Sequence, residues 1–259
     1  MAIDFSSDDL GVATVTINRP DRMNALDRAH YAEFSRIWVE IRDDDRIRCV
    51  IVTGAGNRSF CAGADIKDAV GDTQDLHGLW RTQATPLLNR GLDLWKPVIA
   101  AVNGHCLGGG MTLLLATDLR VAAPDARFGV SEVKRGLVAG LGGTQRLIRQ
   151  IAHAHAMELL LTGDAIDAAT AERWGLVNRV VPAADLLPAA RRYAETIAAN
   201  APLAVCATKE LAYRARDASL AEGMRMEQLV NSLLQRNSAD LAEGRAAFLE
   251  KRAPRFRGA

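Results

Sequence analysis

Two glycine-rich loops share one design, in which an apolar strand leads through small residues to the start of a helix. The first is TGAGNRSFCAGADIK, residues 53–67, and the second is NGHCLGGGMT, residues 103–112. Glycine has no Cβ, so a ligand can come close to the backbone of such a loop. N–H groups at the start of a helix have no partner within the helix, and they attract negative charge. Both loops therefore predict a place where a negatively charged atom is bound.

Phosphate is the first candidate for that atom, but the sequence lacks the motifs that bind it. A Walker loop needs a lysine after its second glycine, whereas Gly110 follows Gly109. The dinucleotide fingerprint fails because Leu113 stands where its third glycine belongs, and Val133 breaks a GxSxG pattern around Ser131. What is left is a pair of amides, one from each loop, that converge on a carbonyl oxygen as an oxyanion hole. The alternative is that the glycines only let a helix pack closely on a strand.

The composition argues against several classes of protein. The chain has 32 Lys and Arg against 31 Asp and Glu, so it has no overall field that attracts nucleic acid or an anionic membrane. Its four cysteines lie far apart without a CxxC pair, which indicates reduced thiols and neither a disulfide nor a metal site. The first ten residues lack the features of a signal peptide, and no run approaches the ~18 apolar residues of a membrane span. We therefore expect a cytoplasmic protein.

The first half of the chain has the pattern of an α/β protein. Residues 49–54 and 97–104 are predicted strands that are apolar on both faces, and residues 12–17 alternate as a strand. Shorter strands are expected at residues 119–123 and 127–130. Between the strands at 12–17 and 49–54, a helix is predicted that Asp27 caps. Its apolar face is made of Tyr31, Phe34, Trp38 and Ile41.

The second half of the chain is mainly helical in pattern. Helices are predicted over residues 145–151, 156–161 and 168–174, followed by a strand over 177–181. From Pro182 onward the chain has helical periodicity almost without a break. One of these helices has an apolar stripe at i, i+3, i+4 and i+7, made of Met226, Leu229, Val230 and Leu233. Such a stripe packs either on its own core or on a neighbouring subunit, and the sequence does not separate the two.

Five longer segments occur in order over nearly the whole chain. They are NRPDRMNAL (18–26), SFCAGADIK (59–67), KPVIAAVNGHCLGGG (96–110), ARFGVSEVKRGLVAGLGGTQRL (126–147) and LTGDAIDAATAERWGLVNRVV (161–181). Together they resemble the enoyl-CoA hydratase/isomerase, or crotonase, superfamily. The resemblance implies an α/β fold in which residues 1–200 form a spiral of ββα units. It further implies that residues 201–259 form a helical region that mediates homotrimers, often paired into hexamers. The substrate would be an acyl-CoA, with no cofactor and no metal besides.

The resemblance also assigns the catalytic groups. The thioester oxygen would lie between the N–H of Ala64 and the N–H of Gly109, where two amides stabilise the charge of an enolate. Hydratases of the family hold one water between two glutamates. The second of these matches Glu132, in FGVSE, but the first is replaced by Thr112, whose hydroxyl has no accessible ionisation to act as a base. Proton transfer would then depend on Glu132, with Thr112 at most holding water.

Weaker matches concern the CoA part of the substrate. Ala62, Ile66 and Lys67 match a stretch that contacts CoA, and Arg22 falls where a basic residue often meets the CoA phosphates. Phe248 and Lys251 match C-terminal positions that, in relatives, reach the CoA of an adjoining subunit.

Three functions stay open at this point. The first is hydration or retro-aldol cleavage, because hydratase-lyases of the hydroxycinnamoyl-CoA type carry a hydroxyl residue where this chain has Thr112. The second is double-bond migration, as in enoyl-CoA isomerases that use one glutamate. Dienoyl isomerases are disfavoured, because their additional acid would fall at Gly140. The third is an acyl-CoA-binding protein that lost its chemistry together with the first glutamate.

Overall fold

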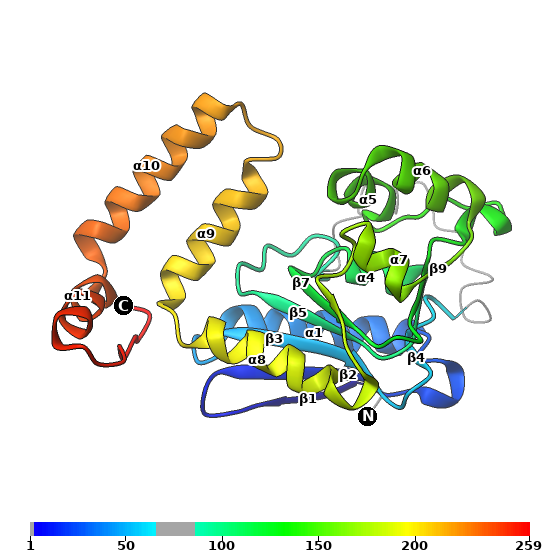
Figure 1. Ribbon diagram of the computed structural model, residues 1–259, viewed down its shortest axis with the longest axis horizontal. Coiled ribbons are helices and arrows are strands. Elements are labelled where there is room, and N and C mark those ends of the chain that lie inside the picture. Colours follow the sequence, from blue (N-terminus) through cyan, green and yellow to red (C-terminus); the bar gives the residue numbers. More distant parts are fainter. Residues whose placement is uncertain (1–2, 66–85) are drawn as a thin grey trace.

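Two β-sheets form the centre of the molecule, and helices cover them (Figure 1). The computed structural model describes residues 3–65 and 86–259. The larger sheet has the strand order β1 (Ile3–Ser7), β2 (Val12–Ile17), β3 (Cys49–Gly54), β5 (Val98–Val102), β7 (Leu119–Ala122) and β10 (Arg179–Val180). The smaller sheet has the order β4 (Ser59–Cys61), β6 (His105–Leu107), β8 (Arg127–Gly129) and β9 (Ile166–Asp167). All pairings are parallel except β1 with β2 and β8 with β9.

Successive turns of the chain place one strand in each sheet. Strand β3 is followed by β4, β5 by β6, and β7 by β8, and each pair contributes its first strand to the larger sheet. Helix α4 (Gly109–Leu114) follows β6 directly. The predicted α/β spiral of ββα units is thereby confirmed.

Each face of the larger sheet has its own core. On one face, helix α8 (Leu186–Ala198) packs its alanines against Cys49 and Ile51 of β3. On the other face, α1 (Arg28–Asp43) packs Phe34 and Trp38 into the core that also holds Val50 and Val52. Because side chains alternate along a strand, a strand covered on both faces must be apolar throughout, as β3 is.

The remaining helices lie at two ends of the molecule in Figure 1. Those beside the smaller sheet are α5 (Gly143–Gln150), α6 (His153–Thr162) and α7 (Ala168–Arg173). Those that extend away from the sheets are α9 (Pro202–Arg214), α10 (Leu220–Asn237) and α11 (Ala239–Glu250). Short 3₁₀ turns occur at Pro20–Arg22, Glu132–Arg135 and Ala183–Asp185.

Most predicted elements are present near their predicted bounds. The predicted strands at 12–17 and 49–54 coincide with β2 and β3, and Asp27 caps α1 as expected. Strands β1, β4, β6 and β9 were not predicted. The boundary at residue 200 and the assembly of residues 201–259 into trimers stay predictions. None of the helices in the described residues is both long and apolar enough to cross a membrane.

Candidate active site

The backbones of the two glycine loops touch at the end of the smaller sheet. A Cβ added to Gly109 would lie 3.3 Å from the backbone nitrogen of Ala64, and one added to Gly63 would lie 2.9 Å from the nitrogen of Gly109. Strand β4 lies within the first loop and ends three residues before Ala64, β6 lies within the second and ends two residues before Gly109, and the two strands are parallel neighbours. The sheet therefore brings Ala64 and Gly109 together.

Both amides are free of hydrogen bonds to the rest of the described chain. The carbonyl oxygen of Gly63 accepts from the nitrogen of Leu26 at 2.8 Å, and the nitrogen of Asp65 donates to the oxygen of Leu26 at 2.8 Å. These two bonds involve the residues on either side of Ala64 but not Ala64 itself. The N–H groups of Ala64 and Gly109 make no hydrogen bond within residues 3–65 and 86–259. Two neighbouring N–H donors are thus left without a partner among the described residues.

Glycine at the start of α4 is required by packing. A Cβ on Gly110 would lie 2.1 Å from the carbonyl oxygen of Cys61, which no side chain can tolerate. Gly108 has a φ of 53°, in the region that favours glycine. Helix α4 therefore begins directly against β4. The packing role of these glycines and their role in exposing amides coexist.

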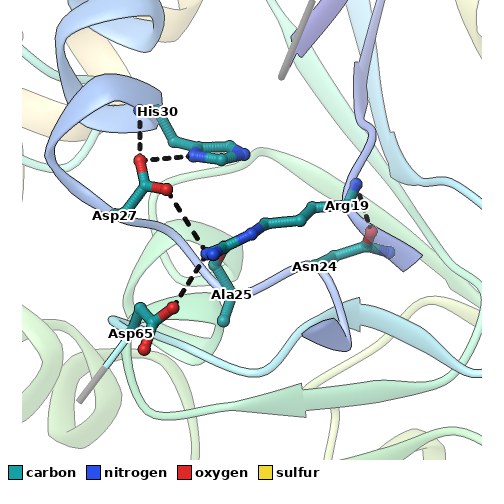
Figure 2. Close-up of polar contacts among 6 residues, drawn as sticks. All are labelled: Arg19, Asn24, Ala25, Asp27, His30 and Asp65. Carbon is teal, nitrogen blue, oxygen red and sulfur yellow. Dashed lines mark hydrogen bonds and ion pairs between the residues drawn. The ribbon is translucent and has the colours of Figure 1, made fainter. Parts of the chain in front are cut away.

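Polar side chains of residues 19–30 hold the first loop in place through contacts with Ser59 and Asp65 (Figure 2). The Nη1 of Arg19 donates to the carbonyl oxygen of Ala25 at 3.2 Å and lies 3.0 Å from Oδ2 of Asp65, next to Ala64. Fully buried Asn24 accepts from the nitrogen of Arg19 and donates to the carbonyl oxygen of Ser59 at 2.6 Å. The NRPDRMNAL segment thus braces the loop that carries Ala64.

Asp27 links this network to α1. One of its carboxylate oxygens accepts from the backbone nitrogen of His30 at 3.0 Å and lies 2.6 Å from Nδ1 of the same residue. The other oxygen lies 3.4 Å from Arg19. The hydrogen bond to the His30 side chain is the main reason why the pKa of Asp27 is lowered. Sequence reasoning found the cap but not the histidine.

Glu132 faces the second loop. It begins the 3₁₀ turn after β8, and its Oε1 lies 3.6 Å from the position of a Cβ on Gly108. Its Oε2 is buried and has no hydrogen-bond partner among the described residues. The nearby cations are used elsewhere, since Lys134 pairs with Asp164 and Arg135 binds Ser131. A buried carboxylate without a partner is costly, and such groups occur at functional sites.

Thr112 has no free proton for water. Its hydroxyl is 2% exposed and donates to the carbonyl oxygen of Gly109 at 2.9 Å. It also accepts from Nδ2 of buried Asn89 at 3.1 Å, so that one acceptor position is left. The geometry gives no support to the expectation that Thr112 holds water. Asn89 was not anticipated, because it lies in a turn without any motif.

Only some of the residues predicted to contact CoA lie near one another within one chain. Arg22 is exposed and precedes Met23, whose carbonyl oxygen accepts from the nitrogen of Ala62 at 3.1 Å, so these two predicted residues are neighbours. Ile66 and Lys67 lie outside the described residues. Phe248, 83% exposed, and Lys251 lie at the end of α11, far from the loops within one chain (Figure 1).

The buried cysteines near the site are protonated, and the described side chains there do not form a metal site. Burial raises the pKa of the Cys61 thiol to about 12 and that of Cys106 well above its usual range, so neither is a thiolate at neutral pH. Within residues 3–65 and 86–259, no group of three His, Cys, Asp or Glu side chains could hold a metal ion.

The spiral and its paired glycine loops define a crotonase fold. An enoyl-CoA hydratase structure from Bacillus anthracis matches with a TM-score of 0.92 and 38% identity, and the match covers 100% of both chains. A family model described as enoyl-CoA hydratase/isomerase matches residues 8–259. The chain belongs to the enoyl-CoA hydratase/isomerase family.

Two relatives illustrate the range within this family. The chain is 46% identical over 248 residues to (E)-benzylidenesuccinyl-CoA hydratase of Thauera aromatica, a match that covers 96% of each chain. It is 39% identical over 251 residues to carnitinyl-CoA dehydratase of Proteus mirabilis, which covers 95% of each chain.

Proposed function

We propose that the protein catalyses the reversible addition of water to a 2-enoyl-CoA thioester. The observation that carries the proposal is the buried Oε2 of Glu132, beside the loop that carries Gly109; neither this oxygen nor the Gly109 N–H has a hydrogen-bond partner among the described residues. Relatives named hydratase and dehydratase support the same reaction, since the two names describe its two directions.

The proposed mechanism needs one carboxylate. The thioester oxygen accepts hydrogen bonds from the N–H groups of Ala64 and Gly109, which stabilise the negative charge that develops when a nucleophile adds to Cβ. Glu132 takes a proton from water as the water oxygen bonds to Cβ, and the same proton then passes from Glu132 to Cα. The water molecule is consumed completely and no other group is oxidised or reduced. Loss of one oxyanion donor costs about 3 kcal/mol of barrier in comparable sites.

Two related reactions use the same groups. Glu132 can also accept the proton of a β-hydroxyl group as the Cα–Cβ bond breaks in a retro-aldol step, and the return of that proton to Cα of the thioester enolate completes the release of an aldehyde or ketone and a shortened acyl-CoA. Alternatively, Glu132 can move a proton between Cα and Cγ and so shift the double bond. The hydrogen bonds of the Thr112 hydroxyl favour this isomerisation as a second candidate, because it needs no bound water.

Assays with paired substrates test the proposal. The protein is incubated with a 2-enoyl-CoA and with a 3-enoyl-CoA, and the absorbance of the conjugated thioester is followed. We expect the absorbance to fall with the first substrate, and we expect Glu132→Gln to reduce the rate about a hundredfold or more while acyl-CoA still binds. Glu158→Gln, which changes an exposed carboxylate on α6, is the matched control.

Other outcomes decide between the candidates. Absorbance that rises with the 3-enoyl-CoA identifies an isomerase. Unchanged turnover in Glu132→Gln, or turnover of neither substrate with retained binding, identifies an acyl-CoA-binding protein without this chemistry.

The proposal extends to assembly and to the CoA moiety. Helices α9 to α11 would hold copies of the chain together as a trimer or a pair of trimers. Arg22, Ala62, Ile66 and Lys67 would contact CoA from one subunit, while Phe248 and Lys251 would reach it from the next. We place this enzyme in the cytoplasm, with no cofactor besides its CoA substrate.

A further inference from the structure

A cation beside this site has no part in the proposed reaction. Arg90 closes a tight turn in which the nitrogen of Leu87 donates to the oxygen of Arg90 at 2.7 Å and the nitrogen of Arg90 donates back at 2.9 Å. The preceding residue, Asn89, is the one whose amide binds the Thr112 hydroxyl. The turn that carries Arg90 is therefore fixed against the first turn of α4.

Arg90 also interacts electrostatically with Tyr31, whose side chain lies against the second glycine loop. The hydroxyl of Tyr31 is 3.3 Å from the position of a Cβ on Gly109. Burial raises the pKa of the Tyr31 phenol to about 12, and the positive charge of Arg90 opposes that rise. The charge of Arg90 thus acts on a side chain that lies against Gly109 of the second glycine loop.

Arg90 has no anionic partner within residues 3–65 and 86–259. Its Nε is buried and makes no hydrogen bond there. No ion pair joins it to Asp93, three positions further along the same loop, or to any other described carboxylate. A buried donor on a cation is costly when left unsatisfied, so an anion at this place would bind favourably.

The surroundings of the turn are positively charged as well. An open cavity of about 790 Å³ adjoins it and is lined by four cations and two carboxylates, namely Arg90, Arg146, Arg149, Arg216, Asp93 and Asp217. The Nη1 of Arg146 donates to the carbonyl oxygens of Asn89 and Leu141, each at 3.0 Å. Burial lowers the pKa of Arg146. Both of its acceptors are neutral carbonyl oxygens, so no carboxylate offsets this effect. Arg149 lies 4.0 Å from Asp217, so the two carboxylates compensate only part of the positive charge around Arg90.

We propose that Arg90 binds a second, free carboxylate on the acyl group, so that the preferred substrates are CoA thioesters of dicarboxylic 2-enoic acids. The inference rests on the proposed function in so far as the acyl group must enter beside Ala64 and Gly109. A guanidinium binds a carboxylate through two parallel hydrogen bonds, which fixes the orientation of the acyl group as well as its charge. A purely hydrocarbon acyl chain would leave Arg90 unpaired.

Selectivity ratios test the proposal. The kcat/KM is measured for dicarboxylic 2-enoyl-CoA thioesters of increasing length and for monocarboxylic ones of equal length. We expect the wild-type protein to prefer one of the dicarboxylic series, and Arg90→Met to reduce that preference about ten- to a hundredfold. Arg90→Lys should restore part of it, because lysine keeps the charge but not the two-bond geometry. Arg149→Met, on the same cavity, should leave the ratio within about twofold of wild type.

A binding measurement separates this inference from the proposed reaction. Calorimetry compares a saturated dicarboxylic acyl-CoA with a monocarboxylic acyl-CoA of equal length, neither of which can be hydrated. An Arg90-dependent preference for the dicarboxylic ligand supports the inference even if no enoyl-CoA is turned over, in which case the proposed reaction fails alone. Hydration without such a preference, in both the binding and the kinetic measurements, overturns the role of Arg90 and leaves the proposed reaction standing.

Discussion

The hydroxyl of Thr112 donates a hydrogen bond of 2.9 Å to the carbonyl oxygen of Gly109, the residue whose own nitrogen lies against Gly63 of the first loop. The same hydroxyl accepts from Asn89. In this position a glutamate would act as an acid or a base. The threonine instead connects the second glycine loop to the turn that contains Asn89. We therefore expect Thr112 to position this loop, and the proposed reaction depends on Glu132 for proton transfer.

Substitution of Thr112 distinguishes positioning from water binding. Thr112→Val keeps the shape of the side chain but leaves the buried amide of Asn89 without its partner and removes one of the hydrogen bonds to the oxygen of Gly109. We expect the free energy of unfolding to fall by about 1–3 kcal/mol in denaturant titrations, and Thr112→Ser to recover most of it. The kcat/KM for hydration should fall by about tenfold or less. A loss of a hundredfold or more at unchanged stability would instead show that the hydroxyl holds the reacting water.

Arg19 is expected to position the amide of Ala64 without touching the substrate. Its side chain is 24% exposed and contacts both the carbonyl oxygen of Ala25 and the carboxylate of Asp65, the residue after Ala64. Arg19→Gln should therefore lower kcat about tenfold with little change in KM, because the donor is less well aimed in the transition state. Arg19→Lys should recover part of the rate. The matched control is Arg36→Gln, which removes a 60% exposed cation from an ion pair with Glu40 on α1. A change in KM alone would contradict the positioning role.

Asp27 makes part of the stability depend on pH. Its pKa is lowered in the folded protein, chiefly by the hydrogen bond with the His30 side chain. A carboxylate whose folded pKa is below the unfolded value of 3.8 stabilises the fold above that value and loses the contribution as the pH falls through the folded pKa. Asp27→Asn keeps a good helix cap but removes the charge. We expect its free energy of unfolding to decrease less than that of wild type between about pH 5 and about pH 3.

The control for that measurement is Asp21→Asn, which changes an exposed carboxylate in the neighbouring 3₁₀ turn. It should follow the acid dependence of the wild-type protein. Equal acid dependence in Asp27→Asn and wild type would show that the Asp27–His30 contact contributes nothing to stability.

The sequence predicted what local pattern determines. Strand β3 is apolar on both faces and was predicted from residue 49 to residue 54, because burial on two sides excludes polar residues. The cap at Asp27 follows from a side chain that satisfies the N–H of His30 three residues later. Both features depend on neighbours in the chain.

What the sequence could not predict depends on contacts between distant residues. Asn89 and Arg90 lie in a turn with no periodicity, and Asn89 acquires its role from Thr112, more than twenty positions away. Strand β9 has two residues, too few to form a pattern. The two glycine loops were recognised, but the free state of the Ala64 and Gly109 amides depends on how the sheet strands and Leu26 pair around them.

Helices α9 to α11 give the last prediction, on assembly. Helices α9 and α10 contain no buried residue, and the predicted stripe on α10 includes Leu229 and Leu233, which are 58% and 61% exposed. Burial of each such leucine stabilises an interface by about 1.5–3 kcal/mol. We therefore expect light scattering to show a trimer or a hexamer for the wild-type protein, and a smaller species for the Leu229→Arg/Leu233→Arg double variant. Gln235→Arg, which adds one positive charge at an exposed position elsewhere on α10, should assemble as wild type. A monomeric wild-type protein at micromolar concentration would contradict the trimer, and the role given to Phe248 and Lys251 of an adjoining subunit would fall with it.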